Sequence, residues 1–150
     1  MNEIQIIRRQ LAAEQLHFVQ VANATAAALR SGAFTANTDF AAACADYFAF
    51  AVTRFGGDST AKLGAARASS GGIAADADAH WQEFLLAFNE ESRKYFAAVD
   101  DLLARNPLVT EWRAMARIDA DSIFAERKHY GRVTAMLPPG LALEPSSPLP

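Results

Sequence analysis

The chain has 150 residues, of which 51% are hydrophobic, so it is long enough to form one domain with its own core. Its formal net charge of −3, without a basic stripe, argues against a nucleic-acid partner. Cys44 is the only cysteine, which excludes an intrachain disulfide and favours a reducing, cytoplasmic location. We find no signal-peptide pattern and no apolar stretch long enough to cross a bilayer, so we expect no membrane partner.

The composition favours helices over strands. Alanine is abundant, β-branched residues are few, and glycine and proline are sparse before residue 137. We therefore predict an all-α fold, in which residues 1–137 form an antiparallel up-down-up-down four-helix bundle. Residues 138–150 are rich in proline and serine and lack periodicity, which is typical of a tail that is disordered or draped over the surface.

The first predicted helix begins after Asn2, a good N-cap, and ends at Ser31-Gly32. The second begins at Thr38-Asp39 and ends at Gly56-Gly57. In both segments apolar residues recur at helical spacing, as at Ile4, Ile7, Leu11, Phe18 and Leu29, and at Phe40, Cys44, Tyr47, Phe48, Ala51 and Phe55. These two stripes are predicted to face the core.

A Gly-rich connection, residues 56–74, separates the second and third predicted helices. Asp58-Ser59 can cap a short helical turn within it, which would run to Ala68. This connection is the least regular interior part of the chain, and we expect it to be the most mobile. The sequence leaves open whether it is a simple turn or a crossover along the bundle.

The third predicted helix spans about residues 75–105, and the fourth follows a break at Asn106-Pro107. The fourth is expected to be continuous to Met136, where Pro138-Pro139-Gly140 stops it. Its inward residues are predicted to be Leu108, Trp112, Met115, Ile118, Ile123, Tyr130, Val133 and Met136.

Two Glu-x-x-His steps, Glu14 with His17 and Glu126 with His129, are the candidate site. Residues three apart lie on one helix face, so each pair can present a carboxylate and an imidazole to one metal ion. Both carboxylates fall in apolar stripes, where they are costly unless they are paired, protonated or metal-bound. At about 1.5 Å per residue the two steps are offset by one or two turns, and Glu91 of the third helix lies near the height of Glu14.

Protein groups offer an alternative to a metal for these carboxylates. Arg54 lies at nearly the height of Glu14, so an internal ion pair is one possibility. Glu126 has Tyr47, Tyr95 and Arg113 as candidate hydrogen-bonding neighbours. The sequence leaves both explanations open.

The layout, with His17 inward on the first helix and the last helix ending near Tyr130-Gly131-Arg132-Val133, resembles hemerythrin-like cation-binding bundles. His17 matches that family's first-helix ligand. The other ligand positions of the family fall at Asp46 and Phe50, His80 and Phe84, and His129 and Thr134. The positions of Glu14, Glu91, Glu126 and His129 are also similar to the ferritin-like pattern, although the second helix lacks its Glu-x-x-His.

These patterns lead to a metal-binding helical protein as the first hypothesis, with Glu14, His17, Glu91, Glu126 and His129 as ligands. The two resemblances imply iron or another divalent metal as the cofactor. The second hypothesis is a non-enzymatic interaction module that forms a homo-oligomer, most simply a homodimer. It rests on apolar residues beyond what one core seam needs, such as Phe34, Phe48, Phe50 and Phe96. A third hypothesis is a small-molecule pocket between helices, lined by Phe and Trp residues.

Overall fold

The structure, a computed structural model, describes residues 2–55, 57–69, 74–105, 108–116, 118–141 and 143, apart from the side chains of 74–76, 109 and 115. Within these residues the fold is all-α, as predicted, and contains no strand. The helical elements are α1 (Glu3–Ser31), α2 (Ala33–Ala36), α3 (Thr38–Ala51), the short 3₁₀ helix η1 (Val52–Arg54), α4 (Ser59–Ser69), α5 (Ala74–Arg105), α6 (Val109–Ala116) and α7 (Ala120–Ala135).

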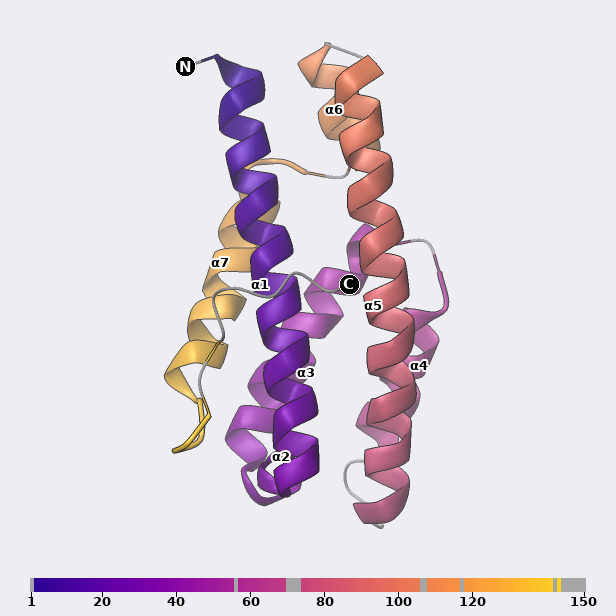
Figure 1. The fold of residues 1–150 in the computed structure, drawn as a ribbon, viewed down its shortest axis with the longest axis vertical. Coiled ribbons are helices and arrows are strands. Elements are labelled where there is room, and N and C mark those ends of the chain that lie inside the picture. The colour runs from indigo at the N-terminus through magenta and orange to yellow at the C-terminus, as the bar shows by residue number, and fades with distance from the viewer. Residues whose placement is uncertain are drawn as a thin grey trace.

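The two longest helices, α1 and α5, lie side by side along the long axis of the molecule (Figure 1). The N-terminal half of α1 faces the C-terminal half of α5, where Arg8 bonds Asp100. Helix α7 packs on α3 and α1, whereas α6 lies at the end of the molecule that holds the start of α1. The Gly-rich connection contains α4, which packs along α5, while Gly56 and residues 70–73 lie outside the described residues.

The predicted ends of the first helix are confirmed. The Asn2 side chain accepts from the backbone N–H of Gln5 at 2.9 Å, and the Gln5 side chain accepts from the backbone N–H of Asn2, which forms a capping box. Gly32 ends the helix in the left-handed region, with φ of 79°, where a residue without a side chain is favoured. At the start of α3, the Asn37 side chain acts as the N-cap by accepting from the backbone N–H of Phe40.

The prediction of one continuous fourth helix is wrong. The chain forms α6 and α7 as separate helices, because Asp119 caps α7 instead of continuing α6. Its side chain accepts from the backbone N–H of Ser122 at 2.7 Å, and the Ser122 hydroxyl accepts from the backbone N–H of Asp119 at 2.9 Å. The predicted break at Asn106-Pro107 lies outside the described residues.

The core is built around aromatic rings. Phe18 of α1 contacts the rings of Tyr47, Phe55, Phe88 and Phe96, so residues from α1, α3 and α5 meet there. Most predicted inward positions are buried, among them Ile7, Leu11, Phe40, Cys44, Phe48, Ala51, Trp81, Phe84, Trp112, Ile118 and Val133. The core therefore follows the helical stripes of the sequence.

Two of the predicted inward positions are wrong. Leu108 is 59% exposed and Met136 is 40% exposed, because Leu108 precedes α6 and Met136 follows α7, at the frayed ends of the elements. In the predicted tail, Leu141 and Leu143 pack against the core, and residues 142 and 144–150 lie outside the described residues. In the part of the chain that the structure describes, no helix has the length and apolar character that spanning a membrane requires.

Candidate functional site

Glu14 of α1 is buried and forms an ion pair with Arg54 of η1. The Arg54 Nη2 atom lies 3.0 Å from Glu14 Oε1 and 3.2 Å from Oε2. Arg54 is itself 4% exposed, and its guanidinium lies over the ring of Phe50 at 5.4 Å, which adds a cation–π contact. The internal ion pair, one of the two explanations that the sequence left open for Glu14, is present in the structure.

Burial raises the pKa of the Glu14 carboxyl from 4.5 to about 7. Desolvation is the largest cause, and the guanidinium of Arg54 acts in the opposite direction. Glu126 raises this pKa and His17 lowers it, so both lie within electrostatic reach of Glu14. Burial therefore makes the protonated form of this carboxyl much easier to populate than it is for an exposed glutamate.

Glu126 of α7 is buried beside His17 of α1 and Tyr47 of α3. The Tyr47 hydroxyl donates to Glu126 Oε2 at 2.9 Å, and His17 Nδ1 lies 3.0 Å and 3.1 Å from the two carboxylate oxygens. With Nδ1 protonated, His17 donates to that carboxylate. The His17 ring stacks on Tyr130 at 3.6 Å, and the Tyr130 hydroxyl donates to Gln20.

Glu14, His17, Tyr47, Arg54 and Glu126 thus form one interior polar cluster, which joins α1, α3, η1 and α7. The sequence predicted Glu14, His17 and Glu126 as site residues and named Arg54 and Tyr47 as alternative partners. The predicted offset of one or two turns between the two Glu-x-x-His steps is wrong. His17 and Glu126 touch, because the break between α6 and α7 changes the position of every residue that follows it.

The other two predicted ligands lie elsewhere. Glu91 Oε1 accepts from the backbone N–H of Ser59 at 2.6 Å, so its carboxylate caps the N-terminus of α4, where the helix dipole stabilises a negative charge. His129 stacks against Phe50 at 5.8 Å. In the described part of the chain, no group of three or more His, Cys, Asp and Glu residues is placed to hold a metal ion.

Asp46 and Phe50 stand where the hemerythrin-like pattern has its second-helix ligands, and both have structural contacts. Asp46 bonds Arg67 of α4 and Arg132 of α7, so it links three helices.

Cys44 is buried, and burial raises its thiol pKa to about 12, which makes it an inert core residue. Gln20 belongs to the surroundings of the polar cluster and carried no sequence signal, since a buried amide resembles any other polar residue in a helix.

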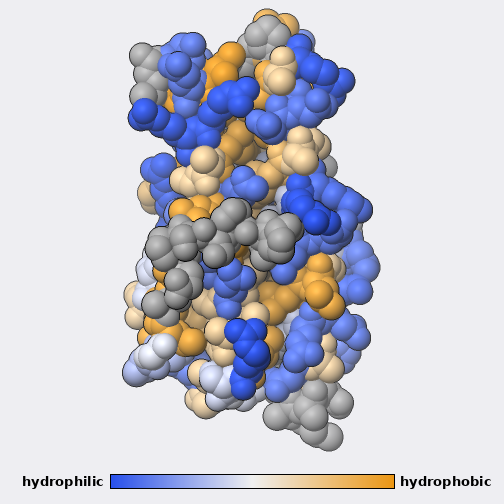
Figure 2. All heavy atoms as spheres, viewed as in Figure 1, coloured by the Kyte–Doolittle hydropathy of each residue, from blue (hydrophilic) through white to orange (hydrophobic). Residues whose placement is uncertain are grey.

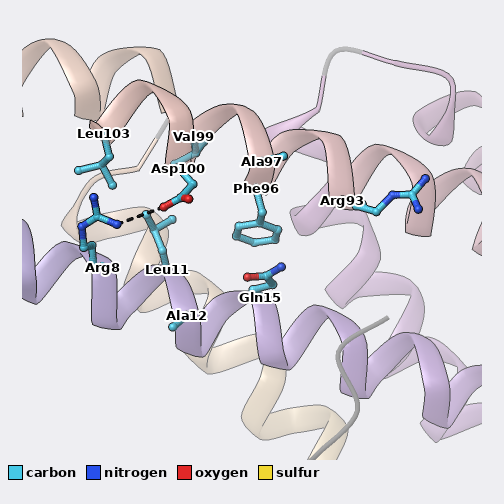
Figure 3. Close-up of a pocket in the computed structure, with 10 residues that line it drawn as sticks. All are labelled: Arg8, Leu11, Ala12, Gln15, Arg93, Phe96, Ala97, Val99, Asp100 and Leu103. Carbon is cyan, nitrogen blue, oxygen red and sulfur yellow. Dashed lines mark hydrogen bonds and ion pairs between the residues drawn. The ribbon is translucent and has the colours of Figure 1, made fainter. Parts of the chain in front are cut away.

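Two pockets bear on the hypothesis of a small-molecule site. The larger, about 400 Å³, is a furrow between α1 and α5 with Leu11, Phe96 and Leu103 in its lining and the Arg8–Asp100 ion pair crossing it (Figure 3). Figure 2 shows apolar side chains along this furrow between hydrophilic rims. The second, about 260 Å³, is lined by Phe34 and Trp81.

Comparison of the chain with protein-family models, with curated proteins and with solved structures finds no match.

Proposed function

We propose that this protein is a helical interaction module that self-associates, with a homodimer as its smallest assembly. The observation that carries the proposal is the exposure of two large apolar side chains in the middle of helices: Leu86 of α5 is 73% exposed and Phe124 of α7 is 71% exposed. Apolar patches rimmed by polar residues mark interaction surfaces, and each of these two side chains would form the apolar centre of such a patch. The Phe residues that first suggested a dimer do not support it, because Phe34, Phe48 and Phe96 are buried and Phe50 is half-buried.

Within this proposal the interior polar cluster has a structural role. A buried ion pair adds little net stability compared with apolar residues, but a mispaired one is costly, so such groups favour one arrangement of helices. The pair Glu14–Arg54 and the contacts of Glu126 to His17 and Tyr47 would then fix how α1, α3 and α7 meet. A four-helix bundle, with α6 and α7 together as its fourth member, is part of this proposal; α1 and α7 run in the same direction (Figure 1), so its order is not up-down-up-down.

The mass of the protein in solution tests the proposed function. Light scattering over micromolar to near-millimolar concentrations should show association, and Phe124→Ser should weaken it without changing the helical content. The matched control is Leu108→Ser, which removes an exposed apolar side chain at a helix end. A wild-type protein that stays monomeric at every concentration would rule the proposal out.

A metal-binding function of the hemerythrin-like or ferritin-like kind is the second candidate. The specific observation in its favour is that His17 Nδ1 and the Glu126 carboxylate converge inside the protein, with Glu14 within electrostatic reach. Iron or another divalent ion would have to displace hydrogen bonds that these residues already make. Elemental analysis of protein purified without chelators tests it: less than about 0.2 metal per chain, unchanged in Glu126→Gln, would remove this candidate.

A further inference from the structure

A cationic face with apolar side chains lies where α1 and α7 meet. Ile6, Arg9 and Gln10 follow helical spacing on α1, and Phe124 and Arg127 do so on α7, so each set shares one side of its helix. A groove of about 320 Å³ is lined by Ile6, Arg9, Gln10 and Arg127, which brings Arg127 of α7 beside the three residues of α1. We call these five residues the cationic face.

Within the described residues, neither arginine of the cationic face has a carboxylate partner, whereas two other arginines on the same helices do. Arg8 bonds Asp100, and Arg132 bonds Asp46. Arg9 and Arg127 are exposed and line the groove with Ile6, and Phe124, which is 71% exposed, lies one helical turn before Arg127. Guanidinium groups bind carboxylates in a planar, two-pronged geometry, so this face fits a partner that carries carboxylates around an apolar side chain.

The chain itself carries such a surface on α5. Glu83, Leu86 and Glu90 are spaced i, i+3 and i+7, so they share one side of the helix, and all three are exposed. Leu86 is 73% exposed between the two carboxylates. Glu90 bonds Arg93 and Lys94, both on the solvent-facing surface, where such pairs are weak and easily exchanged. We call these three residues the acidic face.

We propose that the cationic face of one copy of this chain binds the acidic face of a second copy. This inference rests on the proposed self-association and names the two surfaces that make it. At the centre of the contact, Phe124 of one copy and Leu86 of the other are removed from water. Around them, Arg9 and Arg127 of the first copy meet Glu83 and Glu90 of the second. The contact joins two different faces, so it closes as a dimer where a two-fold axis repeats it and extends to a larger assembly otherwise.

A charge exchange between two variants tests the pairing. One variant carries Arg9→Glu with Arg127→Glu, and the other carries Glu83→Arg with Glu90→Arg. Arg and Glu are both good helix formers, so neither change should alter the fold, which circular dichroism checks. Sedimentation velocity of each variant alone should show a dissociation constant raised at least about tenfold, because like charges now face each other.

An equimolar mixture of the two variants should regain association, since every contact between unlike copies again joins opposite charges. A third variant, Arg30→Glu with Arg105→Glu, has the same net charge as the first but alters neither face, and it should associate as the wild type does. Wild-type association that all the variants retain would overturn the pairing while leaving self-association intact. A monomeric wild type would instead overturn the proposed function and this inference together. If each charge variant loses association and the mixture does not regain it, the pairing alone is overturned.

Discussion

Replacement of Arg54 by Met is predicted to destabilise the protein in a strongly pH-dependent way. Arg54 is the cation that Glu14 contacts in the interior, at 3.0 Å and 3.2 Å. Met fills much of the same space without a charge, so the change removes the partner and leaves a buried carboxyl. Removal of one partner of a buried ion pair costs about 3–5 kcal/mol of unfolding free energy when the other stays charged.

The sign of the pH dependence follows from the raised pKa of Glu14, which is about 7 in the folded protein against 4.5 for an unperturbed carboxyl. Between these values the folded protein holds a proton that the unfolded chain has released, so Glu14 lowers stability as pH rises, by about 1.4 kcal/mol per pH unit. Below pH 4.5 this stabilising contribution is fully present, and it is lost as pH rises through about 7.

Loss of Arg54, whose charge lowers the pKa of Glu14, should raise that pKa further. The cost of Arg54→Met should therefore be smaller near about pH 5, where Glu14 is protonated in both proteins, and larger by about 1.4 kcal/mol near about pH 8, where only the variant still holds the proton. The double variant Arg54→Met with Glu14→Leu should recover most of that loss, because an apolar pair needs no charge partner.

Urea unfolding followed by tryptophan fluorescence measures these differences, since Trp81 and Trp112 are both buried. Wild type, both single variants and the double variant are compared at the two pH values, and Glu14→Gln should flatten the pH dependence between 4.5 and 7. A cost below about 1 kcal/mol near pH 8, or equal costs at both pH values, would refute the reasoning about Glu14.

Three further predictions concern contacts around the cluster and the helix ends. Gly57→Ala should destabilise by about 1 kcal/mol, because its methyl group would displace the Glu91 carboxylate from the N-terminus of α4, whereas Gly64→Ala, with open space around it, should stabilise by about 0.5–1 kcal/mol. Equal effects of the two in thermal unfolding would contradict the close approach. Tyr47→Phe should cost about 1.5–3 kcal/mol by urea unfolding, through a lost bond to a buried carboxylate; no change would mean that the bond is not formed. Asp119→Ala should cost about 1 kcal/mol and lower helix content, and full retention of both would argue against the capping box.

The predicted ligands fall into two groups, one that spacing placed correctly and one that it did not. Glu14 and Glu126 lie in apolar stripes of the sequence, and both are buried and partnered, as that placement requires. Glu91 and His129 were grouped with them because of similar heights or i, i+3 spacing, yet Glu91 caps α4 and His129 packs on Phe50. Height along an axis does not specify the direction of a side chain around it.

The sequence by itself determined the helices and most of the core. The caps at Asn2 and Asn37, the glycine at position 32 and the apolar spacing are local signals, because each acts on hydrogen bonds or faces within a few residues of itself. The break at Asp119 also has a local signal, an aspartate whose carboxylate can accept a hydrogen bond, followed three residues later by Ser122.

Only the tertiary structure decided which groups meet. The pairs Glu14–Arg54 and His17–Glu126 join residues far apart in the chain, and their contacts depend on the position of each helix along its neighbour, which the short breaks between helices set. The exposure of Leu86 and Phe124 is decided the same way, because an apolar residue in a helix faces water or the core according to what packs against it. The sequence identified the buried carboxylates as the unusual feature, and the packing of α1, α3 and α7 supplied their partners.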